Sequence, residues 1–363
     1  MRLGYSPTGG AERYLSRLAG GLARAGVQTA LLGDGSWPAD AWPHGEQMTL
    51  PSGLTLEQAV EQWRQLHPND VLFSFERLLG VDVFRAGDGV HAAYLDRLAK
   101  AEKSPFSWWR RCQRKHQKII NRERKLFGPE SEVEVICNSE MVRQEIRERF
   151  GFPKKQLHLV HNGYQQEALA CKELSQMREE FRRQQGISEE ARVILFVGSG
   201  WKRKGAALLA LAHRQLGRPD VHLVLVGKGK LPRETWPETL HQTGPLADPR
   251  GAFCAADLFA LPTIYDPFSN ACLEASAFGL PVLTTNGNGF SEALAMFPEA
   301  GEVVSSTASI ADWATCLEQW LEPEQLGLGK KAAEKLAAAF SLDQNVAKSV
   351  AVLEQLARAR NPS

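Results

Sequence analysis

Residues 192–205 read RVILFVGSGWKRKG, and this stretch decides the fold. Residues 192–198 are an uninterrupted apolar run, as expected of a strand that is buried on both faces of a parallel sheet. Two glycines then make a turn, and the basic residues 202–204 open the next helix. A strand, a glycine turn and a helix start in this order predict one βα unit of a doubly wound α/β fold.

The same alternation of strand and helix continues along the chain. In the first half we expect strands at 2–5, 27–33, 71–75, 81–85, 133–137 and 156–161, and helices at 10–25, 55–66, 92–127 (broken at 104–105) and 139–150. In the second half the expected strands are 192–198, 222–227, 257–262, 281–284 and 302–304, and the expected helices are 204–216, 249–256, 269–279, 290–297, 309–321, 324–340 and 342–360. A turn near 163 separates the two runs, which predicts two α/β sheets facing each other across a cleft.

The composition is typical of a globular protein with two domains. The chain has 363 residues, of which 43% are hydrophobic and 23% charged, and its six cysteines form no C-x-x-C pair. A zinc or redox motif is therefore not expected. The sequence shows no signal peptide, and no apolar run approaches the ~18 residues of a membrane span, so we expect a cytoplasmic protein.

Positive charge is concentrated in one segment. Residues 96–127 hold eleven basic and three acidic residues, a net charge of +8 in a chain whose net charge is +1. Trp, Phe and Ile accompany these charges, which is the pattern of a helix lying on an anionic membrane surface. The side chains expected to contact the membrane are Trp108, Trp109, Arg110, Arg111, Arg114, Lys115 and Lys118. The alternative is a solvated basic face whose tryptophans pack on the first sheet. Nucleic acid is not expected as a partner, because the segment has no recognition motif.

Two glycine turns at helix starts are candidate phosphate sites. One lies at 198–205, and the other is PTGGAER at 7–13, which opens the first helix. Helix N-termini carry free amides and a partial positive charge, and Arg and Lys add charged donors. A solvated basic loop and a glycine turn made for packing are the respective alternatives.

Two carboxylates lie in the apolar segment 265–283, YDPFSNACLEASAFGLPVL. Burying an ionised carboxylate is costly unless it has a partner. Pro267 favours the first helical position, which places Asp266 near the N-cap, and Glu274 lies ~80° further around the helix. The pair can line one side of a ligand and accept hydrogen bonds from sugar hydroxyls. A plain N-cap for Asp266 and a structural salt bridge for Glu274 remain open as alternatives.

In their order along the chain these segments resemble the family 4 retaining glycosyltransferases of the GT-B fold, which have two Rossmann-like doubly wound domains. YDPFSNACLEASAFGLPVL resembles the family's E-x7-E segment, and VGSGWKRKG resembles its diphosphate loop. GGAERYLSRLAGGLARAG is similar to its N-terminal glycine loop and helix, and VICNSEMVRQEI and LVHNGY to its segment before the interdomain linker. FRAGDGVHAAYL and the basic helix after it are most similar to bacterial lipopolysaccharide-core glucosyltransferases that act on inner-core heptose.

The resemblance implies a UDP-sugar donor held by a domain at 165–340 and an acceptor held by a domain at 1–164, onto which a helix at about 341–363 packs back. The implied diphosphate-binding residues are Arg203, Lys204, Gly10 and Gly198. The implied sugar and ribose contacts are Asp266, Phe268, Ser269, Asn270 and Glu274. The candidate catalytic residues are Asp266, His91 and Asp88. Transfer of a hexose, most often glucose, would retain its anomeric configuration.

The implied acceptor is a lipid-linked glycan, such as lipopolysaccharide-core heptose, at the inner face of the cytoplasmic membrane. No metal or other cofactor is expected, because protein cations would neutralise the diphosphate. Two features depart from the family pattern. The first acid is Asp where Glu is commoner, which leaves the donor sugar open. The first strand is short, so the first sheet is expected to start late or the start of the chain to be truncated.

Two other functions fit the same fold. A nucleotide-sugar 2-epimerase would need further carboxylates and histidines in the cleft, which the sequence does not identify. A non-catalytic scaffold that binds sugar nucleotides is the second alternative, and the intact Arg203, Lys204 and Glu274 argue against it.

Overall fold

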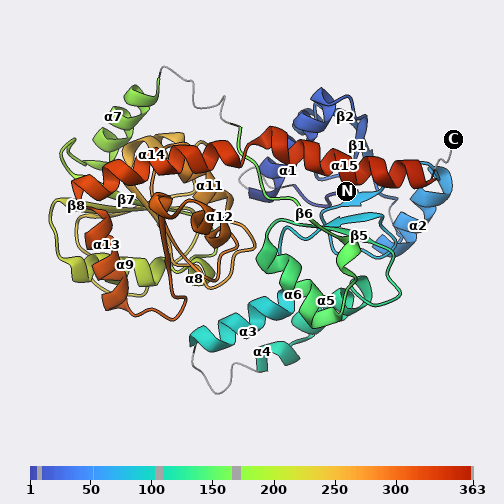
Figure 1. The fold of residues 1–363 in the computed structure, drawn as a ribbon, viewed down its shortest axis with the longest axis horizontal. Helices are drawn as coiled ribbons and strands as arrows, with labels where there is room; N and C mark the ends of the chain where they lie inside the picture. Colours follow the sequence, from blue (N-terminus) through green and yellow to red (C-terminus); the bar gives the residue numbers. More distant parts are fainter. Residues whose placement is uncertain (6–9, 52, 103–108, 166–172, 361–363) are drawn as a thin grey trace. The chain divides into compact units, whose positions relative to one another are not determined.

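The computed structural model describes residues 1–5, 10–51, 53–102, 109–165 and 173–360. Its contacts divide the chain into two compact units, each with parallel strands and helices (Figure 1). Unit 1 comprises Met1–Ala99, Lys103–Gly163 and Leu342–Ser363, and unit 2 comprises Lys100–Glu102 and Tyr164–Ser341. The architecture is therefore α/β in both halves, as the alternation of the sequence predicts.

Unit 2 is built on a six-stranded parallel sheet. Its strands are β7 (Arg192–Val197), β8 (Val221–Val226), β9 (Leu240–Gly244), β10 (Leu258–Leu261), β11 (Val282–Thr285) and β12 (Gly301–Val304). Their order is β12-β11-β10-β7-β8-β9, so the direction of winding reverses between β7 and β10. At such a switch point the loops that leave two neighbouring strands diverge, and ligands bind beyond the carboxyl ends of the strands.

Helices cover both sides of this sheet (Figure 1). They are α7 (Leu174–Gln185), α8 (Trp201–Lys204), α9 (Ala206–Leu216), α10 (Arg250–Ala255), α11 (Asn270–Ala277), α12 (Ser291–Met296), α13 (Ile310–Trp320) and α14 (Pro323–Ala339). α9 packs against α13, α7 against α10, and α11 against α14. The apolar strands form the core between these layers, where Phe196, Phe259 and Trp313 are fully buried.

Unit 1 holds a four-stranded and a two-stranded parallel sheet. The larger sheet contains β3 (Phe73–Ser74), β4 (Val83–Arg85), β5 (Glu134–Cys137) and β6 (Leu157–Leu159), and the smaller contains β1 (Thr29–Gly33) and β2 (Gly45–Thr49). The helices are α1 (Gly10–Arg24), α2 (Leu56–Leu66), α3 (His91–Glu102), α4 (Trp109–Cys112), α5 (Arg114–Leu126), α6 (Glu140–Phe150) and α15 (Leu342–Arg360). α15 packs on α1, where Gly21 leaves room for Val346: a Cβ at Gly21 would lie 2.3 Å from Cγ2 of Val346.

Several elements differ from the sequence prediction. Residues 2–5 do not form a ladder strand; instead Arg2 N donates to Leu32 O (3.2 Å) and Phe75 N donates to Met1 O (3.0 Å), so this segment links β1 to β3. The unpredicted elements include β2, β9 and α7, whose sequences GEQMT, LHQTG and LSQMREEFRRQQ lack a continuous apolar run. The expected helix at 204–216 is preceded by the separate short helix α8, which Gly205 divides from α9. The predicted long helix breaks at Gln113, whose backbone is extended, and the predicted break at 104–105 lies outside the described residues.

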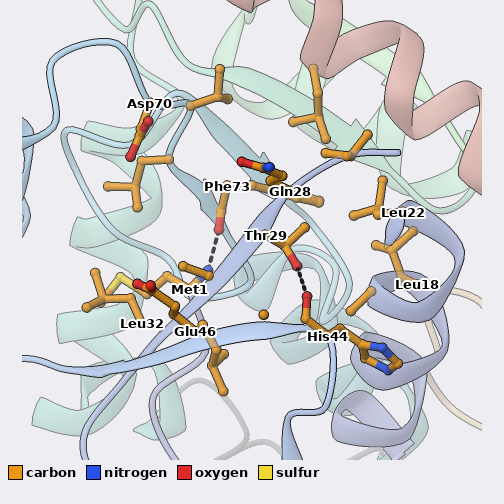
Figure 2. A pocket seen from close by; sticks show the side chains of 18 of the residues that line it. Met1, Leu18, Leu22, Gln28, Thr29, Leu32, His44, Glu46, Asp70 and Phe73 are labelled. Carbon is orange, nitrogen blue, oxygen red and sulfur yellow. Dashed lines mark hydrogen bonds between the residues drawn. The ribbon is translucent and has the colours of Figure 1, made fainter. Parts of the chain in front are cut away.

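A cavity of about 780 Å³ lies beside Met1 in unit 1, lined by residues of α1, β1, β3 and α15 (Figure 2). The α-amine of Met1 donates to the carbonyl of Phe73 at the edge of this cavity. Its burial lowers the pKa of the Met1 amine to about 5. An amine in this position is therefore neutral at neutral pH.

In a recombinant chain that begins at Met1, this buried amine predicts a pH dependence of stability. Between about pH 5 and pH 8 the unfolded chain binds a proton that the folded chain does not, so the free energy of unfolding falls as the pH is lowered through this window. A short apolar extension ahead of Met1 is expected to raise Tm and to remove this part of the dependence. Thermal unfolding of both forms at about pH 5.5 and pH 8 measures it. A Gly-Ser extension moves the amine without adding an apolar side chain, so it is the control for the effect of filling the cavity. An equal dependence of Tm on pH in all three forms would contradict the prediction.

Candidate functional site

The loop after β7 is held in place by Trp201. Its indole Nε1 donates to Gly198 O (2.9 Å), and its ring packs edge-on against Phe196. Gly205, at φ +79°, ends α8 so close to the carbonyl of Pro262 that a Cβ would lie 2.0 Å from that oxygen. These contacts place the basic residues of α8 next to the loop that follows β10, at the switch point of unit 2.

Arg203 joins the two loops. Its carbonyl accepts from Ile264 N (2.8 Å), and its Nη1 donates to Tyr265 O (2.6 Å). About a third of the Arg203 side chain stays exposed. The guanidinium is therefore positioned by the protein and can still reach a ligand.

Asp266 lies between two cations. Its Oδ2 is 3.1 Å from Nζ of Lys204 and 3.7 Å from Nη1 of Arg203, and the side chains of Asp266 and Lys204 are only 11% and 13% exposed. Lys204 reaches Asp266 by crossing Gly198, since a Cβ there would lie 2.5 Å from Cδ of Lys204. The structure thus brings together Gly198, Arg203, Lys204 and Asp266, which were predicted from separate segments.

The N-cap interpretation of Asp266 is wrong. α11 begins at Asn270, and the side chain of Ser269 caps it by accepting from Cys272 N (3.4 Å). Asp266 instead pairs through its backbone with the loop after β11: its N donates to Gly287 O (3.0 Å), and its O accepts from Gly289 N (2.9 Å). The loop after β11 therefore holds Asp266 in an extended bridge, so the helix starts later than Pro267 predicts.

Asn288 is a site residue that the sequence analysis missed. It is fully buried, and its Oδ1 accepts from Ser269 N (3.2 Å) and from Phe290 N (3.1 Å). The backbone amide of Ser269, one of the implied sugar or ribose contacts, is therefore already bonded within the protein. Phe268 is buried against Phe290 in an edge-on contact.

Glu274 lies on α11 and is also buried. Burial raises the pKa of the neighbouring Cys272 thiol to about 12, so this cysteine is an inert core residue. Gly10 is the first residue of α1, and residues 6–9 before it lie outside the described residues. Sugar and phosphate contacts of Glu274, Asn270 and Gly10 remain predictions.

A second group of predicted residues lies in unit 1, at the start of α3. The buried carboxylate of Glu123 on α5 accepts from His91 N (2.7 Å) and Ala92 N (3.3 Å), so it caps that helix. Arg77 pairs with Glu123 (3.0 Å) and lies 3.7 Å from the largely exposed carboxylate of Asp88. No local sequence pattern indicates a role for Arg77 or Glu123.

The imidazole of His91 faces a second imidazole. Its Nε2 lies 2.9 Å from Nδ1 of His116, and the two rings stack with centroids 5.0 Å apart. Burial, the charge of Arg77 and the contact with His116 lower the pKa of His91 to about 4. At neutral pH His91 is therefore a neutral hydrogen-bonding group and not a cation.

The basic segment differs from its predicted form. Ile120 and Leu126 of α5 are buried in unit 1, so these apolar side chains are not available to lipid. Arg111 pairs with Asp96. The basic side chains that stay exposed on the first turns of α5 are those of Arg114, Lys115 and Lys118.

Three further findings concern this segment and the site. Trp108 lies outside the described residues, and Trp109 and Arg110 belong to α4. None of the described helices is long and apolar enough to cross a bilayer. Within the described ranges, no three His, Cys, Asp or Glu side chains gather as metal ligands would. Membrane contact and metal independence remain predictions.

Two family models match the chain. The model described as "Glycosyltransferase Family 4" matches residues 8–167, and the model described as "Glycosyl transferases group 1" matches residues 191–322. The first match covers the predicted glycine turn and the His91 group. The second covers the switch point with Lys204 and Asp266.

Similar proteins include two that are named as glycosyltransferases and one that is named as a probable transglycosylase. The lipopolysaccharide glucosyltransferase WaaG of Escherichia coli K12 is 25% identical over 310 residues, 80% of each chain. A probable transglycosylase of Burkholderia thailandensis is 27% identical over 361 residues, 96% of this chain and 93% of that one. A D-inositol 3-phosphate glycosyltransferase of Corynebacterium aurimucosum is 31% identical over 178 residues, 44% of this chain and 42% of that one.

Solved structures show the same fold. The crystal structure of WaaG aligns with a TM-score of 0.76 at 22% identity, over 99% of this chain and 98% of that one. Anabaena HepE in complex with UDP and glucose aligns with a TM-score of 0.70 at 16% identity, over 96% and 98%. With a family match on each unit and this fold throughout, the chain belongs to the family 4 glycosyltransferases of the GT-B fold.

Proposed function

We propose that this glycosyltransferase is a retaining, metal-independent hexosyltransferase that moves glucose from a UDP-sugar to a lipid-linked glycan such as lipopolysaccharide-core heptose. The proposal rests mainly on the arrangement of Asp266 with Lys204 and Arg203 at the switch point. Cations can bind a diphosphate, and a buried carboxylate can accept hydrogen bonds from sugar hydroxyls. One site therefore holds binding groups for both the diphosphate and the sugar of a nucleotide sugar. The names of the E. coli glucosyltransferase and of the HepE complex with UDP and glucose support it.

In this mechanism the acceptor hydroxyl attacks the anomeric carbon on the face from which the diphosphate leaves. The bond from the anomeric carbon to the phosphate oxygen breaks, a bond to the acceptor oxygen forms, and the hydroxyl proton passes to the leaving phosphate. Lys204 and Arg203 stabilise the charge that grows on the diphosphate, which is the largest contribution a preorganised site makes. Asp266 and Glu274 orient sugar and ribose, and the neutral His91 offers a hydrogen bond without a competing charge.

For the acceptor we propose a lipid-linked glycan at the anionic inner face of the cytoplasmic membrane. The exposed basic side chains of Arg114, Lys115 and Lys118 support this assignment. Ile120 and Leu126 on the same helix pack into unit 1. The attraction of α5 to the membrane in this proposal is therefore electrostatic, and salt weakens it.

A panel of UDP-sugars tests the function. Binding is measured for each donor, then donor hydrolysis, then transfer to a heptose-containing acceptor, with the anomeric configuration of the product read by NMR. We expect UDP-glucose to be used without added metal and with retention. A free 2-epimer formed without acceptor would favour the epimerase, and donor binding without hydrolysis or transfer would favour the scaffold.

The substitution Asp266→Asn separates binding of the diphosphate from contact with the donor sugar. Because Asp266 pairs with Lys204, neutralising Asp266 frees that ammonium for the diphosphate, and we expect UDP to bind at least as tightly as to the unchanged protein. Sugar transfer should fall by about 10-fold, the loss expected for one hydrogen bond to a charged acceptor. Asp248→Asn, in an exposed pair with Arg250, is the control. Equal losses of UDP affinity and turnover would contradict a sugar-contacting role.

A further inference from the structure

Arg85, the last residue of β4 in unit 1, is a buried arginine whose charge is poorly compensated. The residue is 6% exposed. Its Nη2 donates to Oδ1 of Asn162, and its buried Nε has no hydrogen-bond partner among the described residues. Among the described residues no carboxylate forms an ion pair with it. An arginine offers five N–H donors, so most of this group's capacity is unused.

Arg182 in unit 2 shows how this chain compensates a structural arginine. It is fully buried, and its guanidinium donates to the carbonyls of Ser188, Glu189, Ala191 and Ala255. It also pairs with Asp257 at 3.1 Å. A buried charge is tolerated on such terms, because carbonyls and a carboxylate replace the water it loses. Arg85 lacks this set of partners.

The surroundings of Arg85 hold the guanidinium in one place. The ring of Tyr14 lies under it, 3.8 Å from Cζ to the ring centroid. The Tyr14 hydroxyl donates to Oδ1 of the buried Asn345 (2.9 Å), which fixes the ring in turn. Gly87 leaves Nη1 uncovered: a Cβ at that position would lie 2.3 Å from it. The group is thus preorganised, with free donors directed toward the loop that follows β4.

The position in the sheet is one where ligands bind. β4 lies between β3 and β5, and Arg85 stands at its carboxyl end, six residues before His91. In parallel α/β sheets ligands bind beyond the carboxyl ends of the strands. A planar guanidinium with unused N–H donors matches the oxygens of a carboxylate or phosphate.

We propose that Arg85 is the main binding residue of an oxyanion site in unit 1. This site binds a phosphate or carboxylate group carried by the acceptor substrate. The assignment to the acceptor rests on the proposed function, whereas the oxyanion site does not. Tyr14, Asn162 and Gly87 are its positioning residues. The ligand's oxygens accept the N–H groups of Arg85 that the protein leaves without partners.

Thermal unfolding of the full chain tests the site without an activity assay. Inorganic phosphate and acetate are titrated separately, with chloride added to hold the ionic strength. The background carries Lys204→Ala, so that anion binding at the diphosphate loop is weakened. We expect one or both oxyanions to raise Tm by about 2–4 °C, and which of them acts identifies the group.

Two variants make the result decisive. Arg85→Met should abolish the rise in Tm, and without oxyanion it should be at least as stable as its parent, because an uncompensated buried charge has been removed. Arg85→Lys keeps the positive charge but loses the planar guanidinium with its several N–H donors. This variant should therefore need about 10-fold more phosphate for the same rise in Tm. A parent that does not respond to either anion, or an unchanged response in Arg85→Met, overturns the proposal. A large loss of Tm in Arg85→Met with an unchanged response would identify Arg85 as a structural clamp.

Kinetics then test the link to the acceptor. Arg85→Lys should raise KM for the acceptor by about 10-fold and leave KM for the donor unchanged. A Tm response without this change in KM would keep the oxyanion site and reject the acceptor as its source. Absence of any transfer by the unchanged protein would reject the proposed function and leave the Tm result standing.

Discussion

Replacing Lys204 with alanine is expected to lower kcat/KM for sugar transfer by about 100- to 1000-fold, the usual loss when one preorganised charge-stabilising donor is removed. Its ammonium is held 3.1 Å from Asp266 before any donor binds, with 13% of the side chain exposed. The leaving diphosphate gains negative charge as the bond to the sugar breaks. A cation already in place stabilises that charge without reorganisation of the site.

Steady-state kinetics with a UDP-sugar donor measure this loss. Lys202 is the matched control, because it lies on the same short helix and its side chain is 70% exposed. Lys202→Ala should change kcat/KM by no more than about twofold, as expected for an exposed charge. A Lys204→Ala enzyme that keeps wild-type kcat/KM would remove this residue from the mechanism.

The same substitution also affects stability, and a double variant separates the two effects. Without Lys204, Arg203 at 3.7 Å is the one cation that the described residues leave beside the buried carboxylate of Asp266. Leaving such a group short of partners costs about 1–3 kcal/mol. Lys204→Ala combined with Asp266→Asn should recover most of the lost Tm but none of the lost activity, because the paired charges are removed together.

The diphosphate side of the site could be predicted from sequence because its determinants are local. The apolar run 192–198 predicts β7, and the glycines and basic residues that follow it place Arg203 and Lys204 at the end of that strand. The alternation of strands and helices predicts the parallel sheet. It does not give the strand order, and the meeting of this loop with the loop after β10 depends on that order.

The partners of Asp266 were not predictable in this way. Pro267 favours a helix start, but the loop after β11 bonds the backbone of Asp266, and Asn288 holds the helix start at Ser269. Asn288 lies 22 residues along the chain from Asp266, with a strand between them, so no local pattern indicates the contact.

The partners of buried charges in unit 1 were also not predictable, because they come from distant parts of the sequence. Glu123 stands within a strongly basic helix, yet it points inward, pairs with Arg77 and caps α3. Arg85 is one charged residue at the end of an apolar strand, and its sequence context does not show whether a carboxylate meets it. Tertiary pairing decides which charges are structural and which are left for ligands.

Replacing Arg114, Lys115 and Lys118 together with glutamine is expected to weaken binding to anionic vesicles by about 100-fold, because each basic residue near such a surface contributes about 1 kcal/mol. The three side chains are exposed on α5, whereas Ile120, Glu123 and Leu126 on its inner side pack into unit 1. The substitution therefore changes surface charge and leaves the packing of the helix intact. Arg111 is left unchanged, since it pairs with Asp96.

Flotation on vesicles with and without anionic lipid measures the effect. The control carries the same loss of charge elsewhere, by replacing the exposed Lys330, Lys331 and Lys335 of α14 with glutamine. If the membrane is recognised by α5, only the first variant loses binding, and added salt weakens the unchanged protein in the same direction. Equal losses in both variants would show that only net charge matters. Binding that does not depend on lipid charge would remove the basic side chains of α5 from the contact.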